Sequence, residues 1–261
     1  DDELRRLLGR GGLSTLPQAQ AGGLAANGVQ VQARAVVTQG EDVLAIGFAQ
    51  RQGDLPMGGL TSGAALGAQV HLAGDRYQVA AEVATSMADE SGALLLHAYD
   101  LPDIVAGAGT IAPELAADVE GPLTIVTCVG GGGLIAGLTT GMRSGDRIVG
   151  AEPVGASCLH QALAADHRIP AELDSIAADS LGATEVGEIC WNTVAGRDDV
   201  SSVVVTDDDI VAARAALWHD HRLLVEHGTA AALAAVTTGQ VAHNLFNNLV
   251  VLCGANTAVD L

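Results

Sequence analysis

Four consecutive glycines, Gly130, Gly131, Gly132 and Gly133, stand between two apolar runs in the stretch TIVTCVGGGGLIAGLTTGM. The run before them is continuous and apolar, which predicts a buried strand, and a helix is expected to begin near Leu134. At a helix N-terminus several backbone N–H groups lack a partner and the helix dipole is positive, so residues without side chains let these groups close around an anion. The pattern predicts a phosphate-binding loop.

Two other interpretations of this loop stay open from the residues alone. The chain has no GxxxxGK[ST] segment, and GGGGLIAG fits the dinucleotide pattern GxGxxG only when forced. Glu152 nevertheless follows roughly twenty residues later, as a ribose-binding acid would in a dinucleotide site. A glycine turn that only lets strand and helix pack closely is the structural alternative.

The charge of the chain restricts its partners. It carries 31 acidic and 12 basic residues, a formal net charge of −19 over 261 residues. Because the negative electrostatic field of the protein repels nucleic acids and anionic membrane surfaces, we expect no nucleic-acid partner and no membrane partner. All the basic residues are arginine, so the lysine amine that many enzymes use as a covalent catalyst does not occur in this sequence.

The cysteines and the first residues bear on the compartment. The cysteines are far apart and form no CxxC pair, which favours a reducing, cytoplasmic environment. The opening residues, DDELRRLLGR, are charged and do not resemble a signal peptide, and no apolar run is long enough to span a membrane.

Other candidate groups are weaker. The histidines are scattered and predict no metal site: they include His160, His167, His219, His221, His227 and His243. The run Asp207–Asp209 is interpreted as a helix start, and Ser14 as a helix N-cap without a His–Asp partner.

Short apolar runs alternate with alanine-rich segments of helical periodicity along the chain. We expect strands at 33–38 and within ALLLHAY, LTIVTCV, RIVGAEP and NLVVLCGAN, and helices at 41–53, 75–92 and 206–222. Continuously apolar strands that alternate with helices are typical of a parallel sheet covered on both faces. The sequence therefore predicts an α/β fold with a twisted parallel sheet.

Seven spaced motifs together resemble one enzyme family. In order they are HAYDLPDIVAGAGTIAPELAADV, VGGGGLIAGL, IVGAEPVGASC, ADSLGATEVGEI, VVVTDDDIVAARAAL, LVEHGTAAALAAV and VVLCGANT. They are similar to the serine/threonine dehydratase branch of the fold type II pyridoxal phosphate (PLP) enzymes, from about Gly67 to Asn256. The resemblance implies a large PLP-binding domain at 67–261 and a reduced smaller α/β domain at 20–66, with 1–19 packing against the large domain.

The resemblance also implies roles for particular residues. Gly130 to Gly133 and Leu134 would hold the PLP phosphate through backbone N–H groups. Cys253 would face the pyridine nitrogen as a neutral thiol, which suits β-elimination, and Asn256 would continue that wall. Glu226 would lie near the ring edge. Glu152 matches a cation-binding position in some relatives, but the second acidic ligand would fall at Cys158, so we expect no metal.

The N-terminal part departs from the family pattern. The family carries a lysine that forms the Schiff base with PLP, and the best match, GLSTLPQA at 12–19, places Thr15 there. No catalytic residue is therefore assigned. The loop expected to bind the substrate carboxylate reads QGEDV at 39–43, which is short and acidic.

Three hypotheses follow. The first is a PLP-dependent ammonia-lyase of a hydroxy amino acid such as serine or threonine, which would release ammonia. The second is an impaired homologue that binds PLP or a phosphate ester without turnover. The third is an incomplete chain whose segment before about Gly67 is sensitive to proteases. The expected ligand is a small amino acid or analogue, and the resemblance implies a homodimer.

Overall fold

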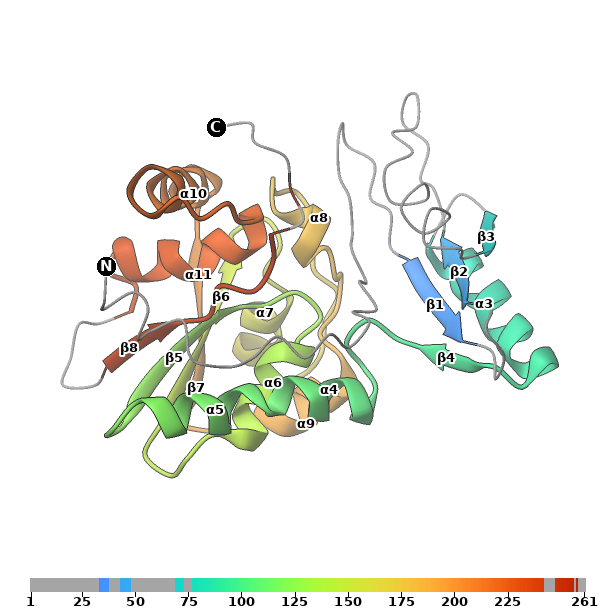
Figure 1. Ribbon diagram of the computed structural model, residues 1–261, viewed down its shortest axis with the longest axis horizontal. Helices are drawn as coiled ribbons and strands as arrows, with labels where there is room; N and C mark the ends of the chain where they lie inside the picture. Colours follow the sequence, from blue (N-terminus) through green and yellow to red (C-terminus); the bar gives the residue numbers. More distant parts are fainter. Residues whose placement is uncertain are drawn as a thin grey trace.

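The computed structural model describes residues 33–37, 43–47, 69–72, 77–241, 247–255 and 257. These residues form two four-stranded sheets, with strand orders β3-β2-β1-β4 and β7-β6-β5-β8, which lie apart in Figure 1. The strands are β1 (Ala33–Val37), β2 (Val43–Gly47), β3 (Gln69–Leu72), β4 (Leu94–Leu96), β5 (Leu123–Cys128), β6 (Arg147–Pro153), β7 (Val200–Val205) and β8 (Asn247–Val250).

The sheet of β5 to β8 is parallel throughout, as the apolar strands predict. Every residue of β5 is buried, and its side chains alternate between two cores. Ile125 packs into one core and Val126 into the other. Because successive strand residues point to opposite faces, a strand that is covered on both faces has to be apolar at every position.

Helices cover both faces of this sheet (Figure 1). The core that contains Ile125 is completed by α4 (Pro102–Gly109), α5 (Ile111–Asp118), α6 (Gly133–Gly141), α7 (Cys158–Ala165) and α9 (Glu188–Val194). The core that contains Val126 is completed by α8 (Ala178–Leu181), α10 (Asp207–His221) and α11 (His227–Thr237). The expected fold class is confirmed for this part of the chain.

The start of α10 is as the sequence predicts. Thr206 is the N-cap and its hydroxyl accepts a hydrogen bond from the N–H of Asp209 at 3.2 Å. The Asp209 carboxylate accepts in return from the N–H of Thr206 at 3.1 Å. This capping box satisfies backbone N–H groups that a helix leaves open, and the aspartates favour the positive end of its dipole.

One expected helix is wrong. The segment at 41–53 contains β2, which pairs antiparallel with β1 and parallel with β3. A short apolar run such as VLAIG fits a strand or a helix equally by periodicity, and here pairing on both sides makes it a strand.

The smaller sheet extends beyond residue 66, where the domain boundary was expected. β3 joins it through β2, and β4 joins it by antiparallel pairing with β1. Between these strands lies α3 (Tyr77–Ser91), which contacts β1, β2 and β4. The smaller sheet therefore contains strands on both sides of residue 66, and the last of them ends at Leu96.

Candidate functional site

The order of the strands in the larger sheet creates a switch point. The chain proceeds from β5 to β6 and β7 in one direction, and β8 then returns to the other side of β5. In open parallel sheets, ligands bind at such a point, outside the carboxyl ends of the strands. The glycine loop follows β5 and Cys253 follows β8, so the sequence-predicted groups meet at this edge.

The glycine loop presents backbone donors at the N-terminus of α6, which begins at Gly133. Gly131, Gly132 and Gly133 are buried. Within the described residues, the N–H groups of Gly131 to Leu134 donate no backbone hydrogen bond. Buried backbone donors are almost always paired, so this arrangement fits an anion such as the phosphate of PLP.

The other side of the loop is closely packed. Gly132 has a φ of 90°, which a residue with a side chain rarely adopts, and a Cβ there would overlap Sγ of Cys190. A Cβ at Gly131 would overlap the ring of Tyr99, and one at Gly133 would lie 2.7 Å from the Tyr99 carbonyl oxygen. The loop therefore serves close packing as well as exposing its N–H groups.

Tyr99 packs against this loop and Asp100 follows Tyr99 in the chain, and neither residue is predicted from the sequence to have a role. Nδ1 of His97 accepts hydrogen bonds from the N–H groups of Tyr99 and Asp100, at 3.2 and 3.0 Å. The Asp100 carboxylate accepts from the N–H groups of Glu188 and Ile189, at 3.0 and 2.9 Å, and so caps α9. The motif HAYD contains one indication of this role, because aspartate is a strong helix-capping residue. The helix that Asp100 caps is about ninety residues away, however, so local spacing cannot identify it.

Cys253 lies beside Cys128, the last residue of β5, with their Sγ atoms 3.6 Å apart. Sγ of Cys253 is also 3.5 Å from the hydroxyl of Thr229, which accepts a hydrogen bond from the N–H of Gly254 at 2.8 Å. The hydrogen bond from Cys128, followed by that from Thr229, lowers the pKa of Cys253 to about 6. This environment favours the thiolate form of Cys253, whereas the resemblance implies a neutral thiol at this position.

Glu226 stands next to this pair. It is the N-cap of α11, its N–H donates to the Gly254 carbonyl at 3.0 Å, and its carboxylate lies against Gly254. Its negative charge contributes to the raised pKa of Cys128. The structure thus brings Glu226, Cys253 and the end of β5 together, as the motif order led us to expect.

Glu152 lies buried near the end of β6, and its carboxylate caps the N-terminus of α7. Its carboxylate accepts hydrogen bonds from the N–H groups of Leu159 and His160, both at 2.8 Å, and from the Ser202 hydroxyl at 2.6 Å. Burial raises its pKa to about 7, against these hydrogen bonds. Through its hydrogen bonds to Leu159 and His160, the Glu152 carboxylate caps the start of α7.

Several expected groups lie outside the described residues. These are Thr15, Asn256 and residues 39–42 of the acidic loop. Leu134 is described and lies half-buried in the first turn of α6. None of the helices in the described part of the chain is long and apolar enough to cross a membrane.

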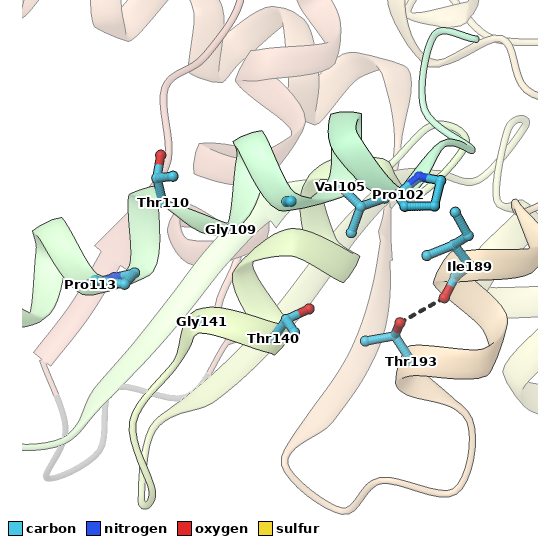
Figure 2. A pocket seen from close by; sticks show the side chains of 10 residues that line it. Pro102, Val105, Gly109, Thr110, Pro113, Thr140, Gly141, Ile189 and Thr193 are labelled. Atoms are coloured by element: carbon cyan, nitrogen blue, oxygen red, sulfur yellow. Dashed lines mark hydrogen bonds between the residues drawn. The ribbon is translucent and has the colours of Figure 1, made fainter.

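A separate pocket of about 540 Å³ opens at the far end of α6 from the glycine loop. Figure 2 shows Val105 and Pro102 of α4, Thr140 of α6 and Ile189 of α9 at its walls. Its lining is mostly apolar, and it does not include any of the sequence-predicted site residues.

Comparison with known proteins agrees with this geometry. The family described as pyridoxal-phosphate dependent enzyme matches residues 21–254. L-threonine ammonia-lyase of Geobacter sulfurreducens is 33% identical over 197 residues, which cover 74% of this chain and 48% of that protein. Serine racemase of Arabidopsis thaliana is 34% identical over 189 residues, which cover 69% of this chain and 56% of that protein.

The fold agrees as well. The crystal structure of serine racemase from Dictyostelium discoideum superimposes with a TM-score of 0.70 at 25% identity, covering 79% of this chain and 67% of that one. The chain spans about half the length of the two curated relatives above. This chain belongs to the pyridoxal-phosphate dependent enzymes, in the serine/threonine dehydratase-like branch with the type II fold.

Proposed function

We propose that this chain binds PLP at the edge between β5 and β8 and acts in the dehydration and deamination of a hydroxy amino acid such as serine or threonine. The observation that carries the proposal is the meeting, at one switch point, of buried N–H donors on the glycine loop with Cys253 and Glu226. The relatives named threonine ammonia-lyase and serine racemase support the substrate class.

Each group has a distinct task in this proposal. The N–H groups of Gly130 to Gly133 and Leu134 hold the phosphate and fix the register of the cofactor. Cys253 would face the pyridine nitrogen of bound PLP, and Glu226 would lie near the ring edge. When bound, PLP supplies an electron sink for the substrate's Cα.

The absence of lysine from the 261 residues favours a second candidate. Without that amine, the proton at Cα has no assigned base in this chain, and the loss of such a group costs several orders of magnitude in rate. The second candidate is a homologue that holds PLP or a phosphate ester reversibly, without turnover.

Binding and turnover are tested separately. PLP is titrated by absorbance in the presence and absence of inorganic phosphate, which should compete for the glycine loop. Gly132→Ala should weaken binding at least tenfold, because a Cβ at this φ displaces the loop. Gly107→Ala is the matched control, since a Cβ there meets nothing within 4 Å.

Turnover is followed as release of ammonia and a 2-oxo acid from L-serine and L-threonine with added PLP. Release above that of PLP alone supports the lyase. Phosphate-sensitive binding without release supports the second candidate, and absence of phosphate-sensitive binding overturns both. The homodimer is also a proposal, which light scattering of the purified chain tests.

A further inference from the structure

Cys128 and Cys253 form a thiol pair at the wall of the proposed cofactor site. Their Sγ atoms are 3.6 Å apart, although the residues are 125 positions apart in the sequence. β5 and β8 are hydrogen-bonded neighbours with Val126 opposite Val250, so Cys128 ends one strand and Cys253 lies just beyond the end of the adjacent parallel strand. A disulfide needs sulfurs about 2 Å apart on Cα atoms roughly 4.4–6.8 Å apart, a range that includes the spacing of about 4.8 Å between adjacent strands.

The two thiols differ in a way that suits sequential reactions. Cys253 is exposed, whereas Cys128 is buried. Hydrogen bonds from Cys128 and Thr229 lower the pKa of Cys253 to about 6. The hydrogen bond to Cys253 and burial raise the pKa of Cys128 well above its usual value, and the nearby Glu226 carboxylate adds to this. Accessible thiolates with a second cysteine in reach are the ones that oxidants modify.

The other two cysteines lack these properties. Burial raises the pKa of Cys158 to about 12, and its Sγ donates to the Gly130 carbonyl at 3.2 Å. Burial also raises the pKa of Cys190 well above its usual value. These residues serve as controls within the same chain.

We propose that Cys128 and Cys253 are a redox-active pair that a hydroperoxide converts to an intramolecular disulfide. The Cys253 thiol first loses its proton. The thiolate then attacks hydrogen peroxide, an S–O bond forms, the O–O bond breaks, and the leaving hydroxide takes up a proton, equivalent to the one lost, as the first water. The Cys128 sulfur then attacks the sulfenic acid of Cys253, an S–S bond forms and the S–O bond breaks. The Cys128 proton joins the departing hydroxide as water. The two sulfurs are oxidised, the peroxide is reduced, and two thiols and one hydrogen peroxide yield a disulfide and two waters.

The disulfide forms whether or not the chain is a lyase, but its effect on the cofactor rests on the proposed function. In the disulfide, the Cys253 sulfur is bound to β5 and carries neither a proton nor a charge for the pyridine nitrogen. The loss of one hydrogen bond between Cys253 and the pyridine nitrogen should lower PLP affinity roughly tenfold.

The arginine-only composition makes the bond simple to map. Trypsin cleaves after arginine, which places Cys128, Cys158, Cys190 and Cys253 in four different peptides, 77–143, 148–168, 169–197 and 223–261. The reduced chain is treated with equimolar hydrogen peroxide, the remaining thiols are alkylated, and the digest is analysed by mass spectrometry. We expect peptides 77–143 and 223–261 joined, two hydrogen atoms lighter than their sum, and separated by dithiothreitol.

Variants and a gel complete the test. Cys128→Ser should lose the cross-link and leave a Cys253 sulfenic acid that dimedone traps, while Cys158→Ser should keep the cross-link. A cross-link through Cys158 or Cys190, a covalent dimer on a non-reducing gel, or full alkylation of Cys128 in oxidised wild-type chain would overturn the proposal. The wild-type digest decides even where a variant fails to fold.

PLP titration of the reduced and oxidised chain separates the two proposals. Weaker binding after oxidation supports the effect on the cofactor, and equal binding overturns that effect. A cross-link in a chain that binds no PLP in either state leaves the thiol pair established and removes the proposed function.

Discussion

The ring of Tyr99 lies against Gly131, so closely that a side-chain methyl at Gly131 would overlap Cε1 and Cζ of the ring. Tyr99 is positioned by His97, whose ring meets it edge-on with centroids 4.5 Å apart. Two of the interpretations left open by the sequence, a phosphate loop and a tight packing turn, are therefore compatible. The N–H groups of the loop are available to an anion, while its Cα atoms are packed against Tyr99 and Cys190.

This relationship predicts a measurable coupling. Gly131→Ala should lower the free energy of unfolding by about 2 kcal/mol, because the added methyl overpacks the contact. In a Tyr99→Ala background the same change should cost about 1 kcal/mol less. Urea unfolding of the four proteins of this double-mutant cycle measures the coupling. Additive effects would show that Gly131 and Tyr99 do not restrict one another.

Asp100 should act as the cap of α9. Asp100→Ala removes the acceptor of two backbone N–H groups and should cost about 1 kcal/mol, with a lower thermal midpoint. Asp89→Ala makes the same chemical change at an exposed position in α3 and should alter the midpoint far less. Equal losses in the two variants would contradict the assignment.

Glu152 should make stability depend on pH. Its pKa rises from 4.5 to about 7 in the folded chain, so the folded state binds this proton more tightly than the unfolded state does. Protonated Glu152 therefore makes its full contribution to the free energy of unfolding below pH 4.5. This contribution, about 3 kcal/mol in all, is lost as the pH rises through 7.

The measurement is urea unfolding at a series of pH values from acid to neutral. Glu152→Gln cannot titrate and should flatten the fall in stability that the wild-type chain shows over this range. Glu114→Gln, at an exposed position of α5, should keep the wild-type slope. A Glu152→Gln profile parallel to that of the wild type would refute the buried, titrating carboxyl.

The two threonines at helix N-caps offer a further comparison. Thr206→Ala should cost about 1 kcal/mol because the hydroxyl of Thr206 caps α10. Thr110→Ala should cost less, since the Thr110 side chain makes no capping hydrogen bond to α5. Thermal unfolding of both variants checks this order, and the reverse order would contradict the capping box.

Local signals predicted the parts of the fold that local interactions determine. The glycine loop, the aspartate-rich start of α10 and the apolar strands of the parallel sheet all depend on residues within one or two turns of one another. The segment at 43–47 was misassigned because its pairing with β1 and β3 decides its conformation, and periodicity over five residues does not.

The residues of the candidate site also fall into those that the sequence indicates and those that only the folded structure brings together. Motif order placed Cys253 and Glu226 near the loop, but nothing local indicates that Asp100 caps α9 or that Cys128 meets Cys253. The spacing of Glu152 from the glycine loop is compatible with a ribose acceptor, yet its hydrogen bonds to Leu159 and His160 depend on how α7 packs after β6. Contacts of this kind become visible only in three dimensions.

The return of β8 to the side of β5 has a consequence for how the chain matures on the ribosome. The glycine loop is synthesised well over a hundred residues before Cys253, and β8 has to enter beside a strand whose other neighbour, β6, is already made. Non-local pairing of this kind closes late, because the long intervening segment must first be ordered. A nascent chain can therefore form its glycine loop early, but the Cys253 side of the proposed cofactor site can assemble only after β8 has been synthesised.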